Sequence, residues 1–190
     1  LTVEFKNVKR IEAITDKMVI AGTGEFSDFQ EAVRHLKKLE KESSNYDDGI
    51  HYSVKEYANY LAQLTYNARN NFNPYFNTFV FAGYENGERF LGTVDHLGNY
   101  FHKDYALAGF ARYFCMPLLA NEWKKEGTLE EAKQVIFKCF EVLFARDCRE
   151  NDNIRFAVVD DKGTTIEEPV YLDLHFPKEM RERANEKLWK

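Results

Sequence analysis

Two glycines separate an apolar segment from a run with helical spacing, in the stretch MVIAGTGEFSDFQEAVRHLKKL from Met18 to Leu39. A strand, a glycine turn and a helix N-terminus are the parts of a nucleotide-binding loop, in which backbone N–H groups receive a phosphate. Gly22 and Gly24 match the first two glycines of G-x-G-x-x-G, but Ser27 occupies the third position and no Gly-Lys-Ser/Thr follows. The pattern therefore favours a tight turn over a phosphate site.

The other residue types that could do chemistry lack the spacing that the chemistry requires. The histidines form neither H-E-x-x-H nor a Cys/His ligand pattern, so the sequence predicts no metal and no cofactor. No G-x-S-x-G occurs, which argues against a Ser-His-Asp hydrolase, and we expect Asp95 and His96 to form part of a turn. The histidines are His35, His51, His96, His102 and His175.

The three cysteines, Cys115, Cys139 and Cys148, are an odd number without C-x-x-C spacing. Because Cys115 and Cys139 fall in strongly apolar helical surroundings, we expect reduced core residues in a cytosolic or nuclear protein.

Length and composition indicate one globular domain. The chain has 190 residues, of which 44% are hydrophobic and 15% aromatic, enough for a sizeable aromatic core. The net charge is -5 with both signs interspersed, so we expect no nucleic-acid partner. No apolar run approaches the roughly 20 residues of a membrane span, so no membrane association is expected.

Helix signals and strand signals occur in separate blocks. Alternation over Val8–Thr15, followed by the apolar run 18–24, predicts a hairpin. Residues 77–101 predict a β meander that turns at Asn86-Gly87 and Leu97-Gly98-Asn99, with strands covered on both faces. A last hairpin is expected over residues 154–172, with its turn at 160–163.

Four helices are expected between these strands. Three begin with a capping pattern, at Ser27-x-x-Gln30, Ser53-x-x-Glu56 and Thr128-x-x-Glu131. The fourth covers 108–126, where Pro117 is expected to kink or divide it. The elements therefore follow the order strands, two helices, strands, two helices and strands. This order predicts a layered α+β sandwich.

With that order established, four blocks resemble a eukaryotic proteasome β subunit, most closely the inactive β7 type: GTGEFSDFQ, NTFVFAGYENGERFLGTVDHLGN, FCMPLL and LFARDCREND. The resemblance implies a four-layer αββα sandwich, the N-terminal-nucleophile hydrolase fold, lacking its first strands in this sequence. It divides the chain into a β-type domain over 1–174, N-terminally incomplete, and a tail over 175–190. Pro177 and the spacing after it predict a helix in this tail, and a solvated end is the alternative.

The resemblance also implies what the chain does not do. In active subunits an N-terminal threonine uses its own amino group as base, with a lysine, an aspartate and a downstream Ser/Asp/Ser group tuning the site. Asp147 matches the family aspartate, but Glu150 and Gly109 stand where the serines are expected, and Thr2 does not match the catalytic start. A glycine cannot orient the amine, so we expect a silent subunit without catalytic residues and with Asp147 bonded to backbone after its helix.

Three functions remain open from the sequence. The first is a non-catalytic β subunit that joins other proteasome α and β subunits in heptameric rings, in the cytoplasm and nucleus. The second is an active threonine peptidase whose nucleophile strand is missing from this sequence, and the third is an unrelated α+β binding module. The apolar stretch FARYFCMPLLANEW predicts an interface on the helix from Ala108, which includes Tyr113 and Trp123.

Overall fold

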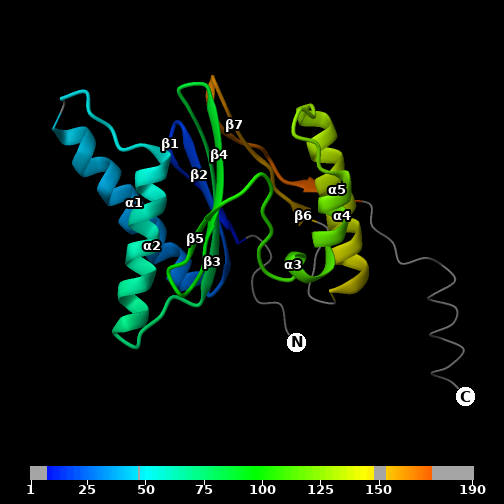
Figure 1. Cartoon of the computed structure of the whole chain (residues 1–190), viewed down its shortest axis with the longest axis horizontal. Coiled ribbons are helices and arrows are strands. Elements are labelled where there is room, and N and C mark those ends of the chain that lie inside the picture. Colours follow the sequence, from blue (N-terminus) through cyan, green and yellow to red (C-terminus); the bar gives the residue numbers. More distant parts are fainter. Residues whose placement is uncertain (1–7, 47, 148–152, 173–190) are drawn as a thin grey trace, which may run out of the picture.

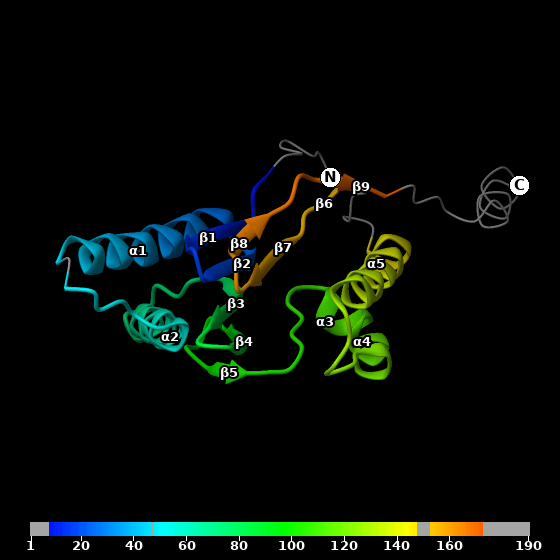
Figure 2. The same cartoon turned by 90° about the horizontal axis from the view of Figure 1, so that it is seen from above.

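The computed structural model describes residues 8–46, 48–147 and 153–172, in which four layers are stacked in the order helix, sheet, sheet, helix (Figures 1 and 2). One helix pair covers the outer face of a five-stranded sheet, a smaller set of strands lies against the inner face, and a second group of helices lies beyond it. This arrangement confirms the layered α+β sandwich expected from the sequence.

The larger sheet is antiparallel throughout and follows chain order, β1-β2-β3-β4-β5. Its strands confirm the predicted hairpin and meander, although the first begins at Ile11 rather than Val8. The turn between the third and fourth strands has positive φ at both Asn86 (53°) and Gly87 (83°), as a type I′ hairpin requires. The strands are β1 (Ile11–Thr15), β2 (Met18–Gly24), β3 (Asn77–Glu85), β4 (Glu88–Val94) and β5 (Tyr100–His102).

Helices α1 (Phe26–Asn45) and α2 (Val54–Asn70) bury their apolar faces against this sheet. Side chains alternate along β3, so that Phe79 and Phe81 are fully buried beneath the helices. Val80 and Ala82 point to the opposite face and are half-buried, which confirms that this strand is covered on both sides. The main core therefore lies between the first helix layer and the larger sheet.

The second strand layer is short and differs in detail from the prediction. Strands β7 (Ala157–Asp160) and β8 (Gly163–Ile166) form the expected hairpin, with the expected turn. The predicted strand beginning at residue 154 is interrupted, because Phe156 is buried and packs edge-on against Phe137 with ring centroids 5.2 Å apart. The flanking residues pair separately, as β6 (Asn153–Ile154) with β9 (Val170–Tyr171).

The second helix layer contains α3 (Ala111–Phe114), α4 (Met116–Glu122) and α5 (Leu129–Arg146). Pro117 divides the predicted helix as expected, because it lies in the first turn of α4, where its missing N–H is tolerated. Buried Cys115 on the linker between α3 and α4 packs with Cys139 and Leu143 of α5 in a second, smaller core.

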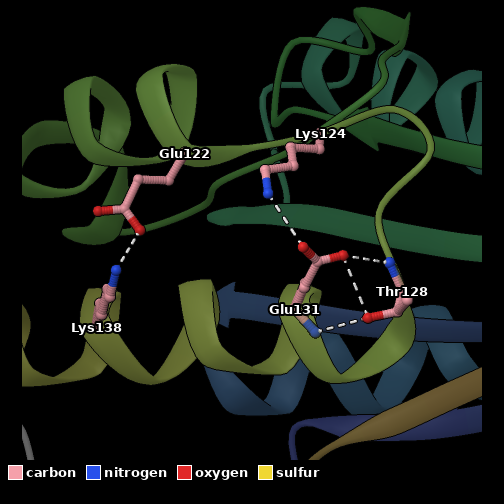
Figure 3. A network of polar contacts seen from close by, with 5 residues as sticks. All are labelled: Glu122, Lys124, Thr128, Glu131 and Lys138. Atoms are coloured by element: carbon pink, nitrogen blue, oxygen red, sulfur yellow. Dashed lines mark hydrogen bonds and ion pairs between the residues drawn. The ribbon is translucent and has the colours of Figure 1, made fainter.

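Two of the three predicted capping patterns are complete capping boxes. Ser53 accepts from the Glu56 backbone N–H, and Thr128 accepts from that of Glu131, while each glutamate side chain bonds back to the cap. At the start of α5, the Glu131 carboxylate also pairs with Lys124 at 3.0 Å (Figure 3). Within the described ranges, no helix is long and apolar enough to cross a membrane.

Candidate functional site

The glycine corner between β2 and α1, comprising residues 22–26, owes its glycines to close packing. A side chain on Gly24 would place its Cβ 1.9 Å from the Phe76 carbonyl oxygen, and φ at Gly24 is +88°. A Cβ on Gly22 would lie 2.3 Å from the Phe29 ring, which the first helix packs against the strand. Both glycines are therefore required by the contact between strand, helix and the start of β3.

The N-terminus of α1 corrects the predicted cap. Glu25, not Ser27, is the N-cap residue, and its carboxylate accepts from the backbone N–H groups of Phe26 (3.1 Å) and Ser27 (3.5 Å). The Ser27 hydroxyl donates to the same carboxylate at 3.2 Å, so Ser27 is the second helical residue. A carboxylate of the chain itself thus occupies the place where a nucleotide loop holds a phosphate. This supports the tight turn over the anion site.

Long-range bonds determine where this helix begins. The Glu25 N–H donates to the Phe76 carbonyl at 3.2 Å. Asn77, which is buried at the start of β3, donates from Nδ2 to the carbonyls of Thr23 (2.6 Å) and Glu25 (2.7 Å). Since these bonds hold Glu25 in an extended conformation, the helix can start only at the next residue.

One of the residues carried over from the family resemblance lies beside this corner. Gly109, just before α3, has φ of +62°, and a Cβ there would lie 3.2 Å from Cγ2 of Thr23 at the end of β2. The fold thus brings this glycine, distant in sequence, against the glycine corner. Asp147 is the C-cap of α5, where its N–H donates to the Leu143 carbonyl at 2.6 Å. Thr2 and Glu150 lie outside the described residues.

Arg10 is a site residue that sequence reasoning missed. Its guanidinium donates from Nη1 to the Gly22 carbonyl at 3.4 Å and lies over the Phe26 ring, 5.4 Å from the centroid. A fixed positive charge therefore lies at the glycine corner. The only local signal is its position just before the alternating residues of β1, which does not distinguish it from other surface cations.

His35, His102 and the two described cysteines each have separate contacts. His35 pairs with Glu31 at 3.1 Å, and the His102 ring lies 5.0 Å from that of Phe90. Among the described residues, no three His, Cys, Asp or Glu side chains form a group able to hold a metal ion. Burial raises the pKa of the Cys139 thiol, and the Cys115 thiol donates to the Cys139 carbonyl at 3.3 Å. His175 and Cys148 fall outside the described ranges.

Asp95 confirms the predicted turn after β4. Its carboxylate accepts from the N–H groups of Leu97 and Asn99, both at 2.9 Å, and from the Asn99 side chain. Partial burial raises the pKa of Asp95, but the bonds from Asn99 and Leu97 outweigh it and hold the pKa below its usual value. The carboxylate is thus committed to the turn and is not available as a catalytic base.

A cleft of about 810 Å³ separates the β4 side of the larger sheet from α4 and α5. Tyr105 and Trp123 line it, with ring centroids 5.7 Å apart. Its lining also includes paired charges, because Glu122 binds Lys138 at 2.6 Å and the Lys124–Glu131 pair lies nearby (Figure 3). These ion pairs tie α4 and its following loop to α5.

The comparisons with known proteins agree with this architecture. A family model described as Proteasome subunit matches residues 1–159. Proteasome subunit beta type-4 of Arabidopsis thaliana is 35% identical over 92% of this chain and 71% of its own length. The protein of the same name from Dictyostelium discoideum is 37% identical over 89% of the chain and 66% of its own length.

A second subunit type is also represented. A probable proteasome subunit beta type-7 of Schizosaccharomyces pombe is 31% identical, over 84% of this chain and 63% of its own length. Similarity to both types, together with the four stacked layers, confirms the expected family. The chain therefore belongs to the proteasome β subunit family and has the N-terminal-nucleophile hydrolase fold.

Proposed function

We propose that the chain is a non-catalytic, structural β subunit of the proteasome core particle. It would occupy a place in a heptameric β ring between other β subunits and against an α ring, in the cytoplasm and nucleus, and would contribute to assembly and to the shape of the proteolytic chamber. The observation that carries this proposal is Gly109, which stands where an active subunit is expected to have a serine.

The geometry around Gly109 gives a physical reason for a glycine instead of a serine at this position. The residue has φ of +62°, a conformation that is strained for any residue with a side chain, and a Cβ there would lie 3.2 Å from Cγ2 of Thr23. No hydroxyl is available from this position to orient the amine of a threonine nucleophile. Restoring a serine would strain the backbone before it could supply a hydrogen bond.

Arg10, which also contacts the glycine corner, supports the proposed non-catalytic role. An arginine keeps its charge at all relevant pH values and cannot serve as a proton carrier. Here its guanidinium is also bonded to a strand carbonyl and stacked over Phe26, so it stabilises the corner. The Arg10 guanidinium therefore has a structural role at the glycine corner.

The alternative is an active threonine peptidase. The two are separated by purifying core particles that contain this subunit, determining its mature N-terminus by intact mass and sequencing, and labelling with a threonine-directed electrophile. A silent subunit remains unlabelled while active subunits of the same particle react. Labelling of this chain at an N-terminal threonine would establish the active alternative.

Membership in a particle is tested independently of catalysis. Affinity purification of the tagged chain should recover the other α and β subunits in stoichiometric amounts, in a complex of several hundred kilodaltons on size exclusion. Elution only as a lone monomer would contradict the structural role.

A further inference from the structure

Helix α2 ends in an unusual way, with an aromatic residue in a glycine position. The N–H of Asn73 donates to the Ala68 carbonyl and the N–H of Phe72 donates to the Arg69 carbonyl, both at 3.0 Å. These two bonds form a Schellman motif, whose C′ residue must adopt the left-handed conformation. Phe72 is that residue, with φ of +55°, where glycine is normally favoured.

In the described part of the chain, the Phe72 side chain has few contacts that could offset this strain. It is 97% exposed, so its ring packs against almost nothing in the described part of the chain. The other non-glycine residue with positive φ in the described ranges is Asn86, a type that tolerates the left-handed region in hairpin turns. A bulky aromatic ring at such a position is neither a good turn residue nor a core residue.

The surroundings of Phe72 have the composition of an interface centre. The connection from α2 to β3 also exposes Phe76 (68%), and Tyr66 on the last turns of α2 is 48% exposed. Residues 71–76, which connect α2 to β3, contain no charged side chain, although Arg69 lies over the Tyr66 ring and the Phe76 N–H donates to the Asp28 carboxylate. Aromatic enrichment with depletion of charge marks the buried centre of protein–protein contacts.

We propose that Phe72 is an anchor residue that inserts into an uncharged, apolar pocket of a neighbouring proteasome subunit. The partner rests on the proposed function, since a ring neighbour is the surface that such a subunit always meets. An apolar surface is the complement of the exposed Phe72 and Phe76 rings, because a charged partner group would lose its hydration against them. The strained backbone projects the ring away from the body of the subunit toward that pocket.

This assignment predicts effects of opposite sign on folding and on assembly. Phe72→Gly relieves the backbone and should raise the thermal midpoint of the isolated chain by roughly 2 °C or more. Phe72→Asn keeps a residue that accepts the left-handed region but removes the ring. Both variants should be depleted from assembled particles, although neither is less stable than the wild type. Asn86→Gly is the matched control, because it relieves a similar backbone without removing an aromatic ring.

The test is a competition inside cells that hold the other proteasome subunits. Wild-type and variant chains carry different tags and are co-expressed, and mass spectrometry compares their ratio in the purified core particle with their ratio in the unassembled pool. We expect Phe72→Gly and Phe72→Asn to be depleted from the particle at least fivefold, and Asn86→Gly to enter like the wild type. Hydroxyl-radical oxidation of Phe72 should fall at least fivefold on assembly.

Equal incorporation of the variants, with wild-type entry intact, would overturn the anchor and leave the proposed function standing. Failure of the wild-type chain itself to enter any particle would overturn both. If Phe72→Gly lowers the thermal midpoint, the ring has an intramolecular role and the inference is wrong. Binding of the wild-type chain to anionic lipid vesicles that is lost in Phe72→Asn would assign the ring to a membrane instead and would also overturn it.

Discussion

Asn77 connects three segments that meet at the glycine corner, and its replacement gives the most direct test of how that corner is held. The side chain is buried, with only 3% of its surface exposed, and its Nδ2 group donates to two carbonyls at 2.6 and 2.7 Å. A net hydrogen bond contributes about 1 kcal/mol, and unsatisfied buried acceptors add to the loss. We therefore expect Asn77→Ala to lower the free energy of unfolding by about 2–3 kcal/mol.

The isosteric variant Asn77→Asp isolates the donors from the packing. It keeps the shape of the side chain but turns a carboxyl group toward two carbonyl oxygens, so the charged form is disfavoured and the folded-state pKa rises above about 3.9, the unfolded value. A raised pKa means that stability is retained below the unfolded value and is lost as the pH rises through the folded one. Asn77→Asp should thus be nearest to the wild type at about pH 4 and progressively weaker toward pH 7.

Urea unfolding of the purified chain, followed by far-ultraviolet circular dichroism at several pH values, measures both effects. Asn59→Ala on the exposed face of α2 is the control and should change stability by less than about 0.5 kcal/mol. Asn77→Ala within that same margin, or Asn77→Asp without the stated pH dependence, would show that the corner does not depend on these two bonds.

Four further substitutions have expected outcomes from the same structure. Gly24→Ala should lower the unfolding free energy by more than about 2 kcal/mol in a urea titration, because its Cβ would overlap a backbone carbonyl oxygen. Thr128→Ala should cost about 1 kcal/mol by the same assay. The bond from the Thr128 N–H, and then Lys124, lower the pKa of Glu131 in the folded chain. Glu131→Gln should therefore lower the unfolding free energy relative to the wild type above pH 4.5, and this difference should shrink as the pH falls through the folded-state pKa. Tyr113→Asp, at a side chain 77% exposed on α3, should leave unfolding unchanged while reducing incorporation into core particles by co-purification; unchanged incorporation would remove this helix from the interface.

Local signals in the sequence were sufficient for most elements of the fold. The capping boxes at Ser53 and Thr128 are four-residue patterns whose bonds lie within one helical turn, and both were predicted correctly. The hairpin at Asn86-Gly87 and the helix break at Pro117 likewise depend on the backbone preferences of the residues themselves.

The errors arose where distant contacts decide between local alternatives. Ser27 and Gln30 offer a plausible cap, but bonds from Phe76 and Asn77, about 50 residues away, move the helix start to Phe26. The last hairpin was predicted as two continuous strands, whereas the contact between Phe156 and α5 divides it. Neither contact produces a periodic pattern that a single sequence would reveal.

The glycine corner shows why some of its residues were missed in the sequence. The sequence lacks the third glycine of the motif, and this alone argues against a phosphate loop. The residues that fill the corner instead, Arg10, Glu25 and Asn77, are recognisable only once β1, β2 and β3 are side by side. Each of the three bonds to backbone groups of the corner. The corner is therefore held together by the chain's own side chains, as the structural role that we propose requires.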